Sequence, residues 1–380
     1  MQAIYEQLLD KMDTLGKGYP RTEKGSEVTY LKKLFSEEDA AFYINMRPGL
    51  HTVEETAAYM GISVEEAREN LERMGHRHLL FWRYGPGDVQ KRYRVIPFVH
   101  GLWEFNVDKI ELQDVVDRVH HFSNGFGETL FDYRLPIVRA VSTRPEAVKD
   151  NGMLRIDDVR ENIKQQNLIV VADCVCRTTG KFGSPCDCAN TMNRCMMFGD
   201  MARYYIEENV AGTRILTVQE ALDIMDENDE LGHVTMVGHS LNYCAICSCP
   251  PCHCAILKAA KLSVALGPKH GKQCFDRWGN YLCTTEQEKC VGCGICVERC
   301  PMQALSMGDD GKVVLNRALC IGCGLCATKC PSGAVMLERK PLNELNIPED
   351  EADFDYFDRM AIEKKIVDEE RRVLAQVGTE

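Results

Sequence analysis

The order of apolar and polar positions predicts two short helices and a hairpin in the first quarter of the chain. Thr52 and Ser63 are each followed three residues later by Glu, and Gly61 lies between the two segments. This spacing is typical of capping boxes that begin helices. The runs HLLFWRY (78–84) and KRYRVI (91–96) are joined by GPGDVQ, which predicts two strands connected by a turn.

Apolar runs also predict strands further along the chain. LIVVADCVCR (168–177) reads as a buried strand with Cys174 and Cys176 at its end, and HVTMVGHS (233–240) reads as another. MMFGDMARYYIEE (196–208) is typical of a helix. A strand end, a loop and a helix start can together surround one metal centre.

The segment after Pro341 changes from an acidic connector to a helical pattern. The connector contains Phe354, Tyr356 and Phe357. The helix that follows has an apolar stripe formed by Met360, Ile366, Val367, Val373 and Leu374. Two interpretations stay open, namely an arm that docks a partner subunit and a helix that packs back on its own chain.

Residues 97–165 carry no motif that indicates chemistry, and we expect helices and loops there. His120 and His121 are expected to be ordinary packed or solvated histidines. The aromatic residues of this stretch are expected to pack in a core or between domains rather than to bind a cofactor: Phe98, Trp103, Phe105, Phe122, Phe126 and Phe131.

Length and composition favour an α+β multidomain protein. With 380 residues, 45% of them hydrophobic and 27% charged, the chain is globular and long enough for two to four domains. The patterns suggest an N-terminal helical segment (1–37), a helix-turn-helix and hairpin domain (38–106), a connecting helical region (107–165), a cysteine-rich domain (166–284), a second cysteine-rich domain (285–340) and the acidic connector with its helix (341–380).

The region 38–106 resembles winged-helix domains, a likeness of fold that carries little functional weight. Its second helix, 63–74, has Glu65, Glu66, Glu69 and Glu72 against Arg68 and Arg73, a poor surface for phosphates. The net charge of −12 also argues against general polyanion binding and favours basic partners. We therefore expect protein docking or scaffolding rather than nucleic-acid binding, although the hairpin cations Lys91, Arg92 and Arg94 leave DNA binding open.

The cysteines indicate metal in a reducing compartment. All 20 lie between residues 174 and 330, and neither a basic and apolar leader nor a run of 18 apolar residues occurs. We expect a cytoplasmic protein without a membrane span. A Gly-rich nucleotide fingerprint is also missing from the sequence, so we expect no nucleotide cofactor.

The most specific pattern is a doubled run, CVGCGICVERCP and CIGCGLCATKCP, in which Gly292, Gly294, Gly322 and Gly324 let the backbone wrap closely. Each run is Cys-x2-Cys-x2-Cys-x3-Cys-Pro, the bacterial pattern for 4Fe-4S clusters in which the fourth cysteine binds the other cluster. Zinc rarely needs such a doubled run. About 60 residues resemble the two-cluster bacterial ferredoxins. The expected ligands are Cys290, Cys293, Cys296 and Cys330 for one cluster and Cys320, Cys323, Cys326 and Cys300 for the other.

The middle cysteines suggest one or two further iron-sulfur clusters. One candidate set is Cys174, Cys176, Cys188 and Cys195, with Cys186 as a spare. The other is Cys247, Cys249, Cys252 and Cys254, near Cys244. Its Cys-x-Cys-x2-Cys-x-Cys spacing is unusual for one cubane, so exchange of ligands between the sets is an open alternative. Arg177 is either a donor to a cluster sulfide or part of a surface ion pair.

Other chemistries also fit the same segment. Cys249-Pro-Pro-Cys252-His253 fits the attachment pattern of c-type haem. We expect no haem, because covalent attachment belongs to exported proteins and the neighbouring Cys247 and Cys254 suit a sulfur site better. Zinc stays open at this position. The remaining thiols, Cys274 and Cys283, are either replacement ligands or ordinary buried cysteines.

Together these segments resemble extended ferredoxin-like iron-sulfur proteins of anaerobic bacteria and archaea, over most of residues 168–340. The resemblance implies an electron-transfer subunit or partner of a larger oxidoreductase, without catalysis of its own. Only Arg299 and Lys329 add positive charge inside the ferredoxin loops, so low potentials are expected. The alternatives are an enzyme with substrate at an open cluster corner or with His253 as a ligand, and a redox-sensing transcription factor.

Overall fold

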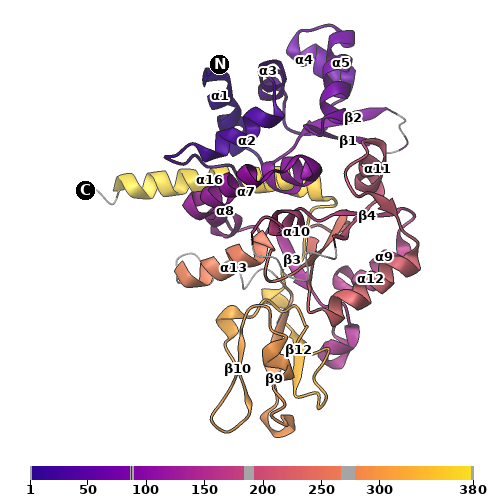
Figure 1. Ribbon diagram of the computed structural model, residues 1–380, viewed down its shortest axis with the longest axis vertical. Helices are drawn as coiled ribbons and strands as arrows, with labels where there is room; N and C mark the ends of the chain where they lie inside the picture. Colours follow the sequence, from indigo (N-terminus) through magenta and orange to yellow (C-terminus); the bar gives the residue numbers. More distant parts are fainter. Residues whose placement is uncertain (1, 86, 88–89, 184–191, 267–278, 378–380) are drawn as a thin grey trace.

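The computed structural model describes residues 2–85, 87, 90–183, 192–266 and 279–377. Three parts of the chain are stacked along the long axis (Figure 1). Amino-terminal helices lie at one end, a sheet with its helices lies in the middle, and the region with the doubled cysteine run lies at the other end. Helix and strand are both well represented, which confirms the α+β class.

The amino-terminal part is helical and ends in a hairpin. Its elements are α1 (Gln2–Asp13), α2 (Ser26–Leu34), α3 (Glu37–Asn45), α4 (Val53–Met60), α5 (Val64–His76), β1 (Leu80–Tyr84) and β2 (Lys91–Val95). Thr52 forms the predicted capping box with Glu55, and Ser63 accepts a hydrogen bond from the Glu66 amide. Gly61 ends α4 in the left-handed conformation. The predicted helices and antiparallel strands are therefore confirmed at these positions.

A series of short helices follows the hairpin: α6 (Trp103–Phe105), α7 (Leu112–His121), α8 (Gly127–Asp132) and α9 (Val159–Gln165). The aromatic residues of this segment are buried as expected, apart from the partly buried Phe122. His121 is buried and lies 2.8 Å from the Pro20 carbonyl, and His120 lies 2.8 Å from the Ser26 hydroxyl. Both histidines are ordinary packed residues.

The expectation of a purely helical connection over 107–165 is wrong at β3 (Val138–Val141), which pairs with β7. Four residues are too few to show a periodicity, and the partner strand lies almost a hundred residues later. Buried Arg139 then joins this strand to its surroundings. Its Nε donates to Asp157 at 2.8 Å, and Asp157 also accepts a hydrogen bond from Asn280 at 2.9 Å.

Among the described residues, the middle part contains a six-stranded sheet with the order β3-β7-β8-β5-β4-β6. The new strands are β4 (Ile169–Asp173), β5 (Asn193–Phe198), β6 (Arg214–Ile215), β7 (Val234–Gly238) and β8 (Ala245–Cys249), all antiparallel to their neighbours. Helices α10 (Val175–Gly180), α11 (Gly199–Glu207), α12 (Val218–Glu230) and α13 (Ala255–Leu266) surround it. The strands predicted from LIVVAD and HVTMVG are confirmed, and so is most of the helix predicted over 196–208. Its first three residues, 196–198, instead belong to β5, and the helix begins at Gly199.

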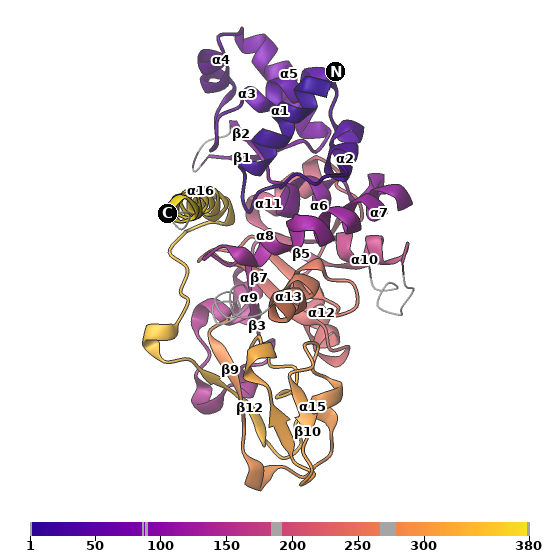
Figure 2. The same cartoon turned by 90° about the vertical axis from the view of Figure 1, so that its left-hand side faces the viewer.

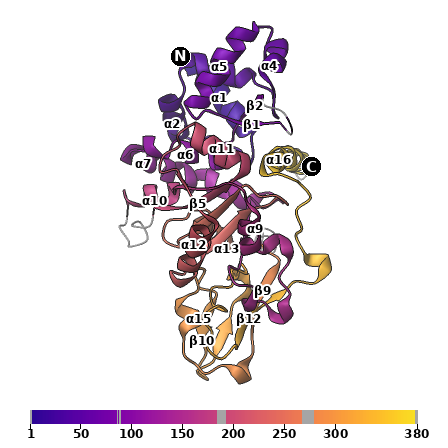
Figure 3. The same ribbon diagram turned by 90° about the vertical axis from the view of Figure 1, so that its right-hand side faces the viewer.

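The central strands are buried on both faces, which explains their unbroken apolar sequence. Val170 and Ala172 belong to a core shared with the amino-terminal helices. Ile169 and Val171 point to a second core that includes Ile163 of α9 and further residues of α12. The sheet therefore separates two cores. Figure 3 shows α12 beside the sheet in the middle part of the molecule.

The doubled cysteine run folds with β9 (Tyr281–Thr285), α15 (Ile295–Glu298), β10 (Leu305–Met307), β11 (Val313–Leu315) and β12 (Val335–Arg339). Strand β9 pairs with β12 and β10 with β11, each antiparallel. This region has a small core of its own, formed by Tyr281, Val335 and Leu337 together with cysteines.

The carboxy-terminal segment forms one long helix, α16 (Asp353–Val377), that runs beside the amino-terminal half (Figure 2). Phe354, expected in a connector, instead lies inside the helix and stacks on Phe81 with ring centroids 4.1 Å apart. Asp358 accepts a hydrogen bond from buried Arg94 at 2.6 Å. The helix thus packs back on its own chain, while Ile366, Val373 and Leu374 of its expected apolar stripe are exposed. No described helix is long and apolar enough to cross a membrane.

Candidate metal centres

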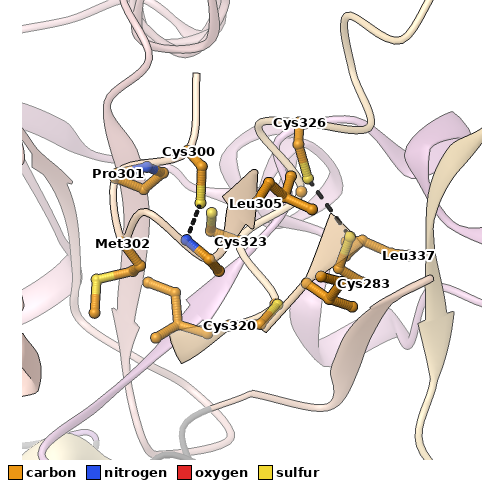
Figure 4. Close-up of a pocket in the computed structure, with 14 residues that line it drawn as sticks. Cys283, Cys300, Pro301, Met302, Leu305, Cys320, Cys323, Cys326 and Leu337 are labelled. Carbon is orange, nitrogen blue, oxygen red and sulfur yellow. Dashed lines mark hydrogen bonds between the residues drawn. The ribbon is translucent and has the colours of Figure 1, made fainter. Parts of the chain in front are cut away.

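Cys300 meets the cysteines of the second run in one small cavity (Figure 4). Cys320, Cys323 and Cys326 line it together with Cys300, which comes from the first run. The exchange of the fourth cysteine that the spacing predicted is therefore the arrangement in which these side chains lie. The donor set and the enclosure fit a 4Fe-4S cluster, which four thiolates would hold.

The second thiol group belongs to the same small core. Cys290 and Cys296 are buried there beside the partly buried Cys330. Burial, and then the nearby Cys326, Cys330 and Cys293, raise the pKa of the Cys296 thiol to about 11. The Val335 amide donates to the Cys330 sulfur at 3.4 Å, a contact that suits a sulfur carrying negative charge.

The glycines of the doubled run are required by their backbone. Gly322 has φ +68°, and a Cβ there would lie 2.3 Å from the Tyr281 carbonyl oxygen. Gly292 has φ +70°, and its Cβ would lie 2.6 Å from the Gly311 carbonyl oxygen. Any side chain here would be strained and would collide with a carbonyl oxygen of a neighbouring segment. Glycine is therefore needed at these two positions because the loop packs closely against protein backbone, in addition to the space that a cluster requires.

A third site is formed by six of the described thiols in the middle part. Hydrogen-bond contacts between sulfurs run in a closed order around Cys174, Cys176, Cys254, Cys249, Cys247 and Cys195, back to Cys174. We call this group the sulfur ring. Donation by Cys176 and Cys195 lowers the pKa of the Cys174 thiol, and donation by Cys195 and Cys249 lowers that of Cys247.

Sheet register explains how residues so distant in sequence form the sulfur ring. Met196 of β5 pairs with Ile246 of β8, which sets the preceding Cys195 opposite Cys247. Ala172 pairs with Cys195, so the end of β4 delivers Cys174 to the same place. Cys176 lies in α10 and Cys254 directly precedes α13. The two cysteine sets expected to be separate, or to exchange ligands, interleave in one site.

Other predicted cysteines lie elsewhere. Cys186, Cys188 and Cys274 fall outside the described residues. Cys252 lies in the turn between β8 and α13 and is exposed, unlike the neighbouring Cys254, which is buried. Cys244 instead donates to Asp353 at 3.0 Å.

Cys283 is a fifth thiol in the cavity of Figure 4, with its sulfur 3.8 Å from that of Cys326. Hydrogen bonding to Cys320 and Cys326 and then burial raise its pKa. A raised pKa favours the protonated thiol over a thiolate ligand. Cys283 therefore lies next to the cysteines of the second run, and both interpretations, a replacement ligand and an ordinary buried thiol, stay open.

Two cationic groups border the sulfur ring. Arg177 is fully buried, so the alternative of a surface ion pair is wrong. Its Nη2 lies 3.1 Å from His233 Nδ1, while Nε and Nη1 have no hydrogen-bond partner among the described residues. His100 hydrogen-bonds to Cys247; burial opposes protonation, yet Cys247 and Glu104 raise its pKa to about 9. Sequence reasoning missed His100, because it precedes Cys247 by well over a hundred residues and belongs to no motif.

A cavity of about 350 Å³ opens on the sulfur ring. All six sulfur-ring cysteines line it. The lining also includes Trp103, Glu104, Arg118, Val119 and Phe122, from the segment in which only packing was expected. Trp103 and Phe122 thus contribute both to packing and to the lining of the cavity.

Within the described parts of the chain, no three His, Cys, Asp or Glu side chains are arranged to hold a single metal ion. The sulfur ring has more thiols than the four of a tetrahedral zinc site, and its burial and donor type fit an iron-sulfur group of more than one metal. His253 lines the cavity but is not one of the sulfur-ring residues.

Comparison with known proteins finds a match to the family model of the 4Fe-4S dicluster domain over residues 289–334. The match covers both cysteine runs and supports an iron-sulfur electron-transfer role for this region. No curated protein and no solved structure matches the chain significantly.

Proposed function

We propose that this protein is a multi-cluster iron-sulfur electron-transfer protein that works as a subunit or partner of a larger cytoplasmic oxidoreductase complex. The observation that carries the proposal is the dicluster match at 289–334 together with a second, buried group of six thiols in the same molecule. A bound 4Fe-4S cluster supplies a one-electron carrier. The described cysteines are all free thiols, which agrees with a reducing compartment.

The residues around the ferredoxin loops support low potentials. Arg299 donates from Nε to the Leu325 carbonyl at 2.9 Å and is also engaged by Asp229. Lys329 forms an ion pair with Glu230. Because acidic groups at the end of α12 pair with both cations, the positive charge of Arg299 and Lys329 favours the reduced clusters less.

Shared packing supports transfer between the ferredoxin loops and the sulfur ring. Cys249 and Cys254 lie in the same core as the partly buried Cys300 and Cys323. This places cysteines of both sites in one continuous packed region. We propose that electrons pass between the dicluster loops and the sulfur ring along it.

The iron and acid-labile sulfide content of anaerobically purified protein tests the proposal. Twelve to sixteen irons per chain are expected, whereas eight would limit metal to the dicluster region, on the basis of four irons per cubane. A redox titration monitored by EPR should find both dicluster centres still oxidised at about −200 mV, within the low part of the range for such clusters. A colourless preparation that contains zinc and no iron would reject the proposal.

The cavity at the sulfur ring favours a second candidate function, an enzyme that binds substrate at the middle site. A concave site of 300–1,000 Å³ beside reactive groups is typical of small-molecule binding, and the cavity of about 350 Å³ falls within that range. A change in the spectrum of one cluster on adding substrate would favour catalysis. Full thiolate ligation at every cluster would favour electron transfer alone.

DNA binding is the weaker alternative because the hairpin cations have partners within the protein. Arg94 is buried against α16, and Lys91 lies 3.1 Å from Glu207 of α11. Tyr204 of α11 also donates to the Leu80 carbonyl at 2.8 Å, so α11 packs on the hairpin. We propose that the winged-helix-like region is a scaffold. Gel-shift titrations over several salt concentrations should find no cluster-dependent specific binding.

A further inference from the structure

The cavity above the sulfur ring has one wall that is unusual for a simple packing region. Trp103, Phe122, Val115 and Val119 give it an apolar surface, and Arg118 of α7 lies among them. The six thiols line the same cavity, and so do the charged or polar side chains of His100, Glu104, Asp173 and Lys258. A molecule in this cavity would therefore contact apolar side chains, the Arg118 guanidinium and the proposed metal site.

Arg118 is half-buried, and two nitrogens of its guanidinium lack the partners that such a group normally has. Its Nε and Nη1 atoms are buried and form no hydrogen bond in the described part of the structure. Glu104, an acidic residue in the lining of the same cavity, accepts a hydrogen bond from the Gly101 amide at 2.9 Å. Burial lowers the pKa of Arg118 and the charge of Glu104 partly opposes this, but Glu104 does not accept a hydrogen bond from Nε or Nη1. Leaving buried N–H groups of a cation unpaired is costly, so such a group needs an explanation.

Cation–π packing explains only part of the arrangement. The guanidinium carbon lies 4.5 Å from the centre of the Phe126 ring and 5.5 Å from that of Phe122. These rings interact with the positive charge. They do not accept the directed hydrogen bonds that the N–H groups offer, whereas an anionic oxygen in the cavity would do so. Burial lowers the pKa of Arg118 to about 10, so the side chain is still positive at neutral pH.

Charge and size limit the class of anion. A carboxylate matches the planar guanidinium and brings a single negative charge. A phosphate would bring up to two charges next to Glu104 and to anionic sulfur, which would repel it. The cavity of about 350 Å³ must also contain any metal group held by the sulfur ring, so only a compact molecule fits the remaining space.

We propose that this cavity binds a small monocarboxylate with an apolar body, held by Arg118 and directed toward the sulfur ring. The inference deepens the second candidate function, because it names the ligand class of the middle site. It rests on the proposed metal site only for what happens at the sulfur end. Binding at the Arg118 end follows from the apolar wall and the guanidinium alone.

Isothermal titration of full-length, anaerobically purified protein with benzoate tests the proposal. Benzamide, the neutral molecule of the same shape, and inorganic phosphate serve as comparison ligands. Wild-type protein should bind benzoate at least tenfold more tightly than benzamide or phosphate, because a charge-assisted hydrogen bond contributes about tenfold or more in affinity. Equal affinity for benzoate and benzamide, tighter binding of phosphate, or undetectable benzoate binding at millimolar concentration would overturn the proposal.

Substitutions of Arg118 test whether benzoate binds at this residue. Arg118→Met should weaken benzoate binding at least tenfold, and Arg118→Lys should weaken it less. Arg47→Met is the matched control, because Arg47 also lies over an aromatic ring, at 4.7 Å from the centre of Tyr59, but is exposed and does not line the cavity. Wild-type affinity in Arg118→Met would reject the role of Arg118.

A second variant covers the case in which Arg118→Met does not fold. Val119 lines the cavity and is 59% exposed, so Val119→Asp should fold and should repel an anion at the entrance. Benzoate binding should fall several-fold while the weak benzamide binding stays unchanged; unchanged benzoate binding would contradict the proposal. Iron and sulfide are measured on every sample. A protein with zinc or no metal that still binds benzoate through Arg118 would reject the electron-transfer function and retain the carboxylate site.

Discussion

The two cysteine-rich regions reach similar chemistry by different routes. In the dicluster region, each group of thiols comes from a tight loop and the last cysteine of the other run, and glycines with positive φ shape the loops. The sulfur ring instead takes thiols from β4, α10, β5, β8 and the start of α13. Local sequence therefore determines the first arrangement, and sheet register determines the second.

This difference affects which other side chains can surround the metal. A site formed mainly by one loop, such as each site of the dicluster region, can be recognised from the cysteine spacing alone. A site formed by register can place other side chains around the metal, as His100, Arg177 and the cavity wall do here. At the middle site, neighbouring side chains can therefore adjust the reduction potential, and the cavity can accept a ligand.

The largest expected effect comes from separating the two regions by mutation. Cys195→Ala with Cys247→Ala should reduce the iron content to about eight per chain and leave the dicluster EPR signals, because the change removes thiols only from the sulfur ring. Cys290→Ala with Cys293→Ala should instead remove about four irons and keep the middle site. An iron content unaffected by the first pair would show that the sulfur ring holds no iron.

The contact between the regions is tested by Arg139→Met. Arg139 and Asp157 are both 1% exposed, and Asn280 next to β9 completes the network. Removing one partner of a buried ion pair is expected to lower the free energy of unfolding by about 3–5 kcal/mol. Chemical denaturation of the holoprotein measures this change.

Arg160→Met is the matched control for Arg139→Met, because the Arg160–Asp226 pair is partly exposed at 22% and 41%. Loss of such a pair should cost about 1 kcal/mol or less. Equal effects of the two substitutions would contradict the structural role of the buried pair.

Arg177→Met should lower the reduction potential of the middle site and leave both dicluster potentials unchanged. Removing a buried cation disfavours the extra electron, and loss of a charged hydrogen bond corresponds to about 60–130 mV for a one-electron couple. Arg177→Lys should restore part of the shift. The readout is a redox titration followed by EPR, and a shift in the dicluster signals instead would place Arg177 in the wrong region.

The smallest effect is expected for Cys283→Ala. If Cys283 is an ordinary buried thiol, iron content and potentials should stay unchanged, and stability should fall by about 1 kcal/mol. The measurements are metal analysis and thermal unfolding. Loss of iron on this substitution would make Cys283 a ligand of the second run.

The sequence was sufficient where structure depends on neighbours along the chain. The cap at Thr52, the strand ending at Asp173 and the doubled cysteine run could all be read directly. It was insufficient where contacts are distant: β3 was missed, and nothing local showed that Cys174, Cys176 and Cys195 would interleave with Cys247, Cys249 and Cys254. His100 and Arg118 reach the cavity only through tertiary packing, which leaves no local pattern.

The return of α16 to the amino-terminal half has a consequence for synthesis. Arg94 contacts Phe354 and Asp358, which are 260 and 264 positions later in the chain. At translation rates of 5–20 residues per second, those partners emerge about 15–50 s after Arg94. During that interval Phe81 and Arg94 are not yet covered by α16. The nascent chain therefore exposes an apolar and cationic surface, which a ribosome-associated chaperone would be suited to shield.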